Sequence, residues 1–224
     1  MTPQALMLFA AGFGTRMGAL TADRPKPLVR VAGRPLIDHA LDLIDAVVPG
    51  PVVANLHYRA EQLESHLAGS RVVTLREEPE ILETGGGLRN ALPLLGPGPV
   101  WTMNSDAVWT GPNPLALLRD HWEEGMEALL LGIPPERAVG HSGKGDFLPG
   151  PPVMRGPGLI YSGVQIIRTE GLADVREAAF SLNLLWDRML ARGTLHVMPY
   201  DGEWCDVGRP EGIALAEAML ARNV

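Results

Sequence analysis

The residues best suited to chemistry lie near the start of the chain, in the segments GFGTR at 12–16 and PKP at 25–27. A short apolar run at 6–11 precedes the first segment and predicts a buried strand that ends in a glycine-rich turn. Such a turn presents backbone N–H groups to phosphate oxygens, and Arg16 and Lys26 add two positive charges at the same corner. This combination predicts a site that holds and cleaves a nucleoside triphosphate.

Two common phosphate-binding motifs do not account for this segment. The dinucleotide fingerprint, G-x-G-x-x-G, requires a third glycine where this chain has Met17, and this disfavours a dehydrogenase. The motif G-x-x-x-x-G-K-[ST] is absent from the chain. Arg16 and Lys26 could also be ordinary solvated surface charges. Lys26, however, stands between two prolines that restrict its backbone, as expected of a rigid loop that faces phosphate.

Two aspartates far apart in the sequence are candidate ligands for a metal ion. Asp106 follows an apolar run at 100–103, and Asp206 lies in the string WCDVG at 204–208. Carboxylate, water and phosphate oxygens are the ligands that Mg²⁺ prefers, so the two residues could hold Mg²⁺ together. Each could instead be an aspartate that caps a turn, and their spacing alone does not show that they meet. The neighbouring Cys205 has no evident base partner and is interpreted as a buried apolar residue.

A second glycine-rich segment, ETGGG at 83–87, is predicted to be a turn that leads into a helix at 88–95. Three consecutive glycines allow a base or a sugar to lie directly on the backbone, although the segment could also be only a flexible link. The polar residues Asn55, His57 and Asn104 follow predicted strands. Ligands collect at the carboxyl ends of parallel strands, so we expect these residues near a bound nucleotide.

The elements that position these residues alternate along the first half of the chain. Strands are predicted at 6–11, 52–56, 72–75, 100–103 and 128–133, and helices at 36–48, 60–67, 88–95 and 115–124. Strands that alternate with helices of this length predict parallel pairing with right-handed crossovers. The expected fold is therefore a three-layer α/β/α sandwich around a Rossmann-like, mostly parallel sheet.

The second half of the chain follows a different pattern. Residues 134–158 are rich in glycine and proline and predict a long loop or a pair of short edge strands. Further along, strands are predicted at 161–167 and 195–198, a helix at 182–191 and a last helix from Pro210. We interpret residues 1–224 as one domain, with 134–165 as a substrate-side loop or small lid. In it, His141, Lys144 and Asp146 could close over a substrate or form a solvated loop.

Composition narrows the functional classes. The chain has 224 residues, and its apolar fraction of 46% is enough for a large core. A net charge of −7 and the lack of a basic run argue against a nucleic-acid partner. The single cysteine fits a reducing compartment, and no segment reads as a membrane span or signal peptide. We therefore expect a cytoplasmic protein.

Five motifs, in order along almost the whole chain, resemble those of the sugar-1-phosphate nucleotidylyltransferases. They are LFAAGFGTRM with RPKPL (8–17 and 24–28), ETGGGLRNAL (83–92), NSD (104–106), YSGVQI (161–166) and WCDVGRPEG (204–212). Within this family, the segment ANLHYRAEQLESHL at 54–67 resembles the uridylyltransferase branch that acts on N-acetylmuramic acid α-1-phosphate. Guanylyltransferases for mannose 1-phosphate and heptose phosphates share much of the pattern.

The resemblance implies a role for individual residues. Arg16 would contact the leaving pyrophosphate, Lys26 the α-phosphate, and Asp106 and Asp206 would hold Mg²⁺, which makes Arg16, Lys26 and Asp106 the catalytic group. The implied nucleotide-binding residues are Ala11, Gly12, Gly14, Thr15, Arg16, Lys26, Asn55, Glu83, Thr84, Gly85 and Gly86, and the sugar-binding residues are Asn104, Lys144, Asp146 and Gly163. Many relatives bind the sugar phosphate through the lysine of a Glu-Lys-Pro string. This chain has none, and Lys144 could take its place.

The implied reaction is the Mg²⁺-dependent transfer of UMP from UTP to N-acetylmuramic acid α-1-phosphate, with release of pyrophosphate, in cell-wall recycling. A mannose- or heptose-1-phosphate guanylyltransferase is an alternative with the same chemistry. An alternative of another class is a non-catalytic regulatory module that binds a nucleotide sugar. Such a module should have lost charged site residues, whereas Arg16, Lys26, Asp106 and Asp206 are all present, which favours an enzyme.

Overall fold

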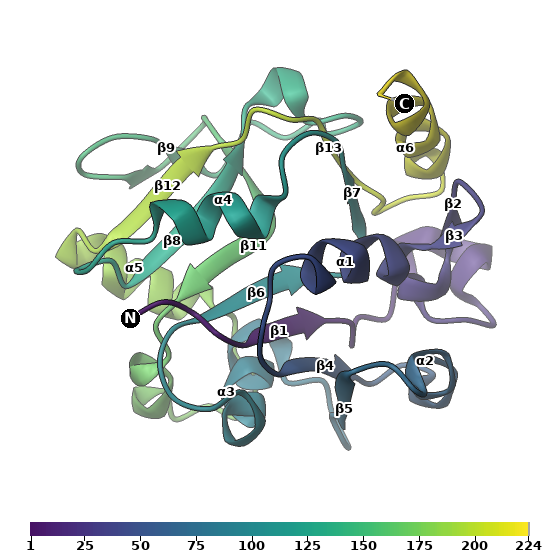
Figure 1. Ribbon diagram of the computed structural model, residues 1–224, viewed down its shortest axis with the longest axis horizontal. Coiled ribbons are helices and arrows are strands. Elements are labelled where there is room, and N and C mark those ends of the chain that lie inside the picture. The colour runs from purple at the N-terminus through teal and green to yellow at the C-terminus, as the bar shows by residue number, and fades with distance from the viewer. Residues whose placement is uncertain (224) are drawn as a thin grey trace.

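A seven-stranded sheet forms the centre of the computed structural model, which describes residues 1–223 (Figure 1). Its strands are β1 (Leu6–Phe9), β4 (Val52–Leu56), β5 (Val72–Arg76), β6 (Val100–Asn104), β8 (Ala128–Ile133), β11 (Ile160–Ile167) and β12 (Leu195–Pro199). They lie in the order β12-β8-β11-β6-β1-β4-β5. Strand β11 runs antiparallel to β6 and β8, and the other neighbouring pairs of this sheet are parallel. The predicted mostly parallel sheet is confirmed.

Helices cover both faces of this sheet and complete the predicted three layers (Figure 1). One face is covered by α1 (Leu36–Asp45), α2 (Ala60–Leu67) and α4 (Pro114–His121), and the other by α3 (Glu83–Leu95) and α5 (Asn183–Arg192). Leu6 and Leu8 of β1 pack on the first face, whereas Met7 between them packs on the second. Burying each such side chain contributes about 1.5–3 kcal/mol, so both helical layers are held by the strands.

A third, smaller core lies beside the sheet, under the candidate site. Met17 from the glycine-rich segment packs there with Cys205, Val207 and Met219, the last from helix α6 (Glu211–Arg222). The short elements of the chain are β2 (Arg30–Val31) with β3 (Arg34–Pro35), β7 (Ala107–Trp109) with β13 (Trp204–Asp206), β9 (Phe147–Leu148) with β10 (Met154–Arg155), and the 3₁₀ turns η1 (Thr15–Thr21), η2 (Lys26–Leu28), η3 (Pro135–Arg137) and η4 (Glu170–Asp174). Of the two structures predicted for 134–158, a pair of short strands is present. Among residues 1–223, no helix has the length and apolar character needed to cross a membrane.

Most predicted elements are present, with differences at their ends. The ranges of β4, α2 and β8 match the predicted ones. Helix α1 ends at Asp45 rather than at 48, because two valines and Pro49 follow, and none of these favours a helix. Helix α4 begins at Pro114 because the Asn113 side chain caps it, and it ends at His121, where the backbone of the next residue becomes extended. These shifts do not alter the order of the layers.

The prediction of a turn at the glycines 85–87 was wrong. Helix α3 begins at Glu83, so these glycines form its first turn and are buried. A Cβ atom on Gly85 would lie 2.3 Å from Cε2 of Phe180, and one on Gly86 would lie 2.4 Å from the carbonyl oxygen of Ala178. The glycines therefore allow the segment around 178–180 to pack directly against the start of the helix, and Gly85 N donates to the carbonyl of Phe180.

Candidate active site

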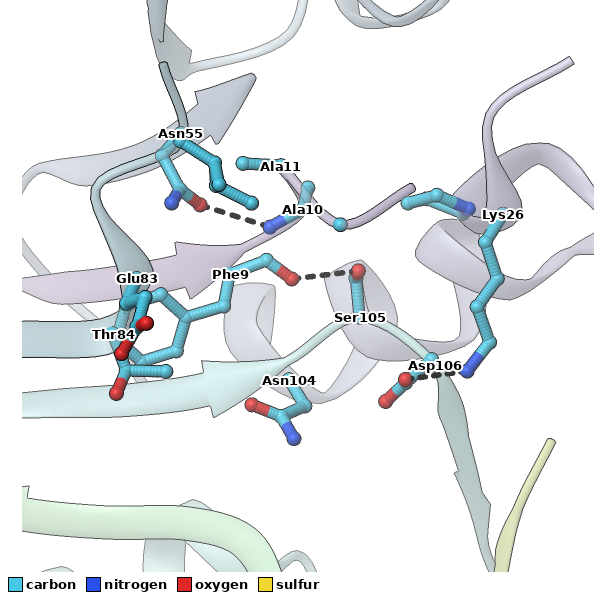
Figure 2. A pocket seen from close by; sticks show the side chains of 13 residues that line it. Phe9, Ala10, Ala11, Lys26, Asn55, Glu83, Thr84, Asn104, Ser105 and Asp106 are labelled. Atoms are coloured by element: carbon cyan, nitrogen blue, oxygen red, sulfur yellow. Dashed lines mark hydrogen bonds and ion pairs between the residues drawn. The ribbon is translucent and has the colours of Figure 1, made fainter. Parts of the chain in front are cut away.

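A cavity of about 210 Å³ opens at the carboxyl ends of β1, β4 and β6 (Figure 2). Phe9, Asn55, Glu83 and Thr84 lie on one side of it, and Lys26 and Asp106 lie on the other. The predicted site residues that line it are Ala11, Gly12, Lys26, Asn55, Glu83, Thr84, Asn104 and Asp106. This is the position at which a sheet of this type binds ligands, and the lining suits a flat, partly apolar group next to charged ones.

The two aspartates of the sequence analysis meet in the structure. Strand β13 pairs antiparallel with β7, and this register places Asp206 opposite Ala107, the residue after Asp106. Val207 N donates to the carbonyl of Asp106 at 2.9 Å and fixes the pairing. Sequence reasoning did not find these two short strands, because three-residue segments next to a loop carry too little periodicity to be recognised.

Lys26 lies between the two carboxylates. Its Nζ atom is 2.6 Å from Asp106 Oδ2 and 3.9 Å from Asp206 Oδ1, and its side chain is 10% exposed. Burial raises the pKa of Asp206, and the neighbouring Asp106 raises it further, while Lys26, Arg16 and His141 lower it. The lysine therefore compensates part of the repulsion between the two half-buried carboxylates.

A second hollow, of about 430 Å³, lies on the far side of Asp206. Arg16, His141 and Arg209 contribute its basic side chains. Gly208 packs closely against both Arg16 and Asp206. A Cβ atom at this position would lie 2.9 Å from Asp206 Oδ2 and 3.4 Å from Arg16 Nη2. The two hollows are linked by Asp106, Lys26 and Asp206, so one extended anionic ligand could contact basic groups from both.

The floor of the cavity is held by Glu77, a residue that sequence reasoning missed. This buried carboxylate accepts hydrogen bonds from Asn55 Nδ2 at 2.7 Å and from Leu82 N at 2.8 Å. Asn55 Oδ1 in turn accepts from Ala10 N at 2.9 Å (Figure 2). Both polar atoms of Asn55 thus already have partners within the protein. The only signal in the sequence was an acidic residue two positions after the predicted strand at 72–75.

The residues predicted to bind the sugar divide into two groups. Gly163 has a left-handed backbone (φ 85°) at an irregularity of β11, and a Cβ there would lie 2.7 Å from Asn104 Nδ2. This pair lies together, and Asn104 lines the cavity. Lys144 and Asp146 are exposed and line neither hollow, and Asp146 accepts a hydrogen bond from Tyr161 N. Asn104 with Gly163 is therefore the part of this group that borders the cavity.

The remaining predicted nucleotide-binding residues lie beside the cavity and not in its wall. Gly14 and Thr15 belong to the loop that ends at Lys26, and Gly14 is left-handed (φ 64°) with space for only a hydrogen, since a Cβ would lie 2.9 Å from Lys26 Cβ. Gly85 and Gly86 face the protein interior, as described above. The structure thus brings Lys26 from the loop 12–26 together with the two carboxylates, whereas the glycines of α3 face away from the cavity.

Two carboxylates suit one kind of metal site. Within residues 1–223, no group of three or more histidine, cysteine, aspartate or glutamate side chains is arranged to hold a metal ion by itself. Magnesium usually takes one or two protein carboxylates and completes its shell with water and substrate phosphate oxygens. Asp106 and Asp206 provide such a set of ligands, so the residues present fit a metal that arrives with a nucleotide.

Comparison with known proteins defines the class. Residues 6–177 match the model of the MobA-like NTP transferase domain, and the chain belongs to this nucleotidyltransferase family. An N-acetylmuramate α-1-phosphate uridylyltransferase from Caulobacter vibrioides is 39% identical, with 98% of each chain covered. A mannose-1-phosphate guanyltransferase from Gibberella zeae is 28% identical over 92% of this chain, which spans 61% of that protein. Among solved structures, HddC from Yersinia pseudotuberculosis shares the fold, with a TM-score of 0.76, 21% identity and coverage of 98% and 100%.

Proposed function

We propose that this chain transfers UMP from UTP to N-acetylmuramic acid α-1-phosphate and releases pyrophosphate. The geometric observation that carries the proposal is the meeting of Asp106, Asp206 and Lys26 at the mouth of a mostly apolar cavity. The similarity to the uridylyltransferase from Caulobacter vibrioides, which extends over almost the full length of both chains, supports this choice of substrates. The more distant guanyltransferase matches over only part of its own length.

The site residues are proposed to act on charge and position. The nucleoside would occupy the cavity between Ala11 and Thr84, and Arg16 and Lys26 would bind the triphosphate. Asp106 and Asp206 would hold Mg²⁺, which neutralises phosphate charge and stabilises the transition state when it is bound. Lys26, which contacts Asp106 Oδ2, would turn towards the α-phosphate when the nucleotide binds.

The reaction is an in-line displacement at the α-phosphorus of the nucleotide. A phosphate oxygen of the sugar 1-phosphate forms the new O–P bond, and the bond from the α-phosphorus to the bridging oxygen of pyrophosphate breaks. The attacking oxygen is already an anion at neutral pH, so the site needs no general base. The protein contributes by holding two highly charged groups in line and by stabilising the charge of the leaving group.

The acceptor is proposed to lie next to Asn104 and Gly163. We interpret the segment 134–165 as a substrate-side loop or small lid, and we propose that Lys144 and Asp146 reach the sugar 1-phosphate by closure of the part that precedes β11, since β11 itself is held between β6 and β8. This closure is needed because Lys144 and Asp146 are exposed and line neither the cavity nor the second hollow. We place the reaction in the recycling of cell-wall sugars in the cytoplasm, because muramic acid is a cell-wall sugar.

The test is a matrix of pyrophosphate release with Mg²⁺. UTP, GTP, CTP and dTTP are each combined with N-acetylmuramic acid 1-phosphate, mannose 1-phosphate and glucose 1-phosphate. Release confined to UTP with the muramic acid phosphate is the expected result. Release with GTP and mannose 1-phosphate would retain the chemistry and replace the substrates. No release in any combination, with a nucleotide sugar still bound, would contradict the proposal and favour a regulatory module.

A further inference from the structure

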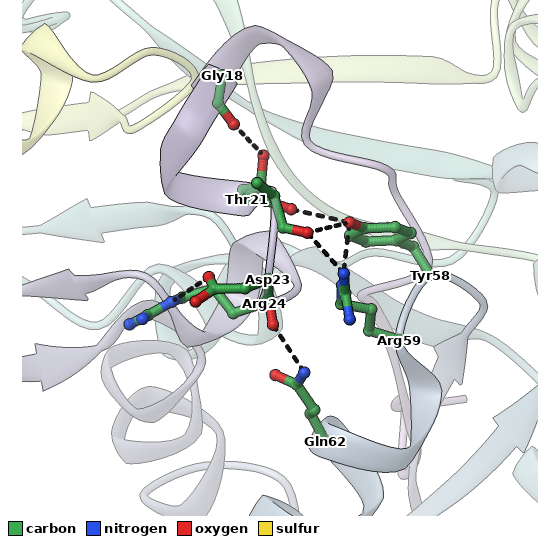
Figure 3. A network of polar contacts seen from close by, with 8 residues as sticks. Gly18, Thr21, Asp23, Arg24, Tyr58, Arg59 and Gln62 are labelled. Atoms are coloured by element: carbon green, nitrogen blue, oxygen red, sulfur yellow. Dashed lines mark hydrogen bonds and ion pairs between the residues drawn. The ribbon is translucent and has the colours of Figure 1, made fainter.

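Three side chains, from the β4–α2 connection and the first turn of α2, contact the loop that carries Arg16 and Lys26 (Figure 3). Tyr58 Oη donates to the carbonyl of Thr21 at 2.9 Å, and Arg59 Nη2 donates to the carbonyl of Ala22. Gln62 Nε2 donates to the carbonyl of Asp23 at 2.8 Å. We call residues 12–26 the phosphate loop and the set Tyr58, Arg59 and Gln62 the bracket. Three successive carbonyls of the phosphate loop are thus each held by the bracket.

The bracket and the phosphate loop are each internally connected. Arg59 Nε donates to Tyr58 Oη at 3.0 Å, so the hydroxyl that holds Thr21 is itself oriented by the arginine. Thr21 is buried, and its hydroxyl donates to the carbonyl of Gly14 at 3.0 Å. Phe13 packs edge-on against His57, with ring centroids 5.2 Å apart. Tyr58 of the bracket also packs against Phe13, with ring centroids 6.0 Å apart, so the bracket contacts the phosphate loop near its start as well as at 21–23.

The backbone of Arg59 is strained in a way that the bracket explains. Its φ of 51° lies in the left-handed region, which costs a residue with a side chain of the order of 1 kcal/mol. This conformation begins helix α2 and, at the same point, Arg59 reaches the carbonyl of Ala22. A glycine would adopt the backbone without strain but would provide no guanidinium, so the side chain at 59 has a use that outweighs its conformational cost.

We infer that the bracket residues Tyr58, Arg59 and Gln62 are positioning residues that hold the phosphate loop in its nucleotide-binding conformation before the nucleotide arrives. In the structure Lys26 is also held by Asp106, but that ion pair must break when the lysine turns to phosphate. The bracket contacts backbone carbonyls several residues away and stays intact during this exchange. The inference rests on the proposed function for the identity of the nucleotide, and on contacts alone for the loop.

The first experiment needs no substrate. Backbone amide hydrogen exchange of residues 14–24 is measured in the wild-type protein and in Arg59→Met. Exchange of these amides should accelerate at least about threefold, because the bracket is expected to limit local opening of the loop. Unchanged exchange in this segment would overturn the inference. This measurement remains valid if the chain turns out to use other substrates, so its failure and the failure of the proposed function can be distinguished.

The second experiment separates positioning from general destabilisation. In Arg59→Met the KM for UTP should rise about tenfold with kcat within about threefold, because only a fraction of the free enzyme keeps a competent loop and bound UTP restores it. A partly unfolded enzyme would instead lose kcat at unchanged KM. Tyr58→Phe, which removes one hydroxyl, should also raise the KM for UTP. Arg59→Lys should give a KM for UTP between those of the wild-type protein and Arg59→Met.

Arg71, in the connection between α2 and β5, provides a matched control. Its guanidinium also donates to a backbone carbonyl, that of Gly50 at 3.0 Å, and to Asp45, and neither lies in the described site. Arg71→Met should leave the KM for UTP and the exchange of residues 14–24 at wild-type values. An equal rise of the KM in the Arg71 and Arg59 variants would overturn the inference, because the effect would not depend on contact with the phosphate loop.

Discussion

Replacing Glu77 with glutamine is expected to destabilise the protein, although the two side chains have nearly the same shape. Glu77 is 1% exposed and accepts one hydrogen bond on each carboxylate oxygen, from Asn55 Nδ2 and from Leu82 N. The Asn55 amide cannot turn over to help, because its Oδ1 accepts from Ala10 N. Either orientation of a glutamine amide at 77 therefore places its NH₂ group against another N–H donor.

The size of the effect follows from these contacts. A hydrogen bond to a charged group contributes about 1.5–3 kcal/mol, and a buried donor left without an acceptor costs about 1–3 kcal/mol. Removing a buried charge offsets part of this loss. We expect the free energy of unfolding in urea to fall by about 2–3 kcal/mol, and the midpoint of thermal unfolding by about 4–12 °C in a domain of this size.

A double variant tests more strictly whether the loss of stability comes from these hydrogen bonds. Asn55→Asp combined with Glu77→Gln restores all three hydrogen bonds: the glutamine would donate to the aspartate, accept from Leu82 N, and leave one aspartate oxygen for Ala10 N. Asn55→Asp alone would place two carboxylates in contact and should be strongly destabilising. The double variant should therefore be more stable than either single variant. A loss below about 0.5 kcal/mol in Glu77→Gln, or additive losses in the double variant, would refute this account.

Three further predictions concern other parts of the site. Burial, with a smaller contribution from Asp206, raises the pKa of the Cys205 thiol to about 11. At pH 8 a disulfide reagent should therefore modify Cys205 only after the protein is unfolded in urea, and rapid modification of the folded protein would contradict the burial of this thiol. Gly163→Ala should raise the KM for the sugar phosphate more than that for the nucleotide, since the new Cβ would displace Asn104, and equal effects on both would argue against an acceptor role. Gly85→Ala should lower the free energy of unfolding by about 1–3 kcal/mol in urea titrations, because its Cβ overlaps Phe180, and no loss would show that this contact is loose.

The sequence predicted the sheet, the layers and most elements because long apolar segments with clear periodicity dominate the core. The runs at 52–56 and 128–133 are buried on both faces, and their predicted ranges match β4 and β8. The glycines at 85–87 misled the prediction, because their low helix propensity is overridden by the close packing of Phe180. Helix propensity describes an isolated segment, whereas in this protein the packing against Phe180 determines that the glycines are helical.

The candidate site was predicted in its parts but not in its assembly. Lys26, Asp106 and Asp206 were each identified from their local strings, yet 100 residues separate the two aspartates. Their meeting depends on the short β7–β13 pairing, which has no recognisable pattern. Glu77 and the bracket were missed for another reason: their function is to hold other residues, and nothing in their own sequence indicates which partners they reach.

The most direct test of the central claim, that nucleotidyl transfer takes place at the Asp106–Asp206 pair, is pyrophosphate release by Asp106→Asn, Asp206→Asn and the double variant at saturating substrates and Mg²⁺. We predict a fall in turnover of about 10²–10³-fold or more in each single variant, and little further loss in the double variant, because the two residues act as a unit. Thermal unfolding should show that all three variants remain folded. Turnover near the wild-type rate in either single variant would contradict the claim.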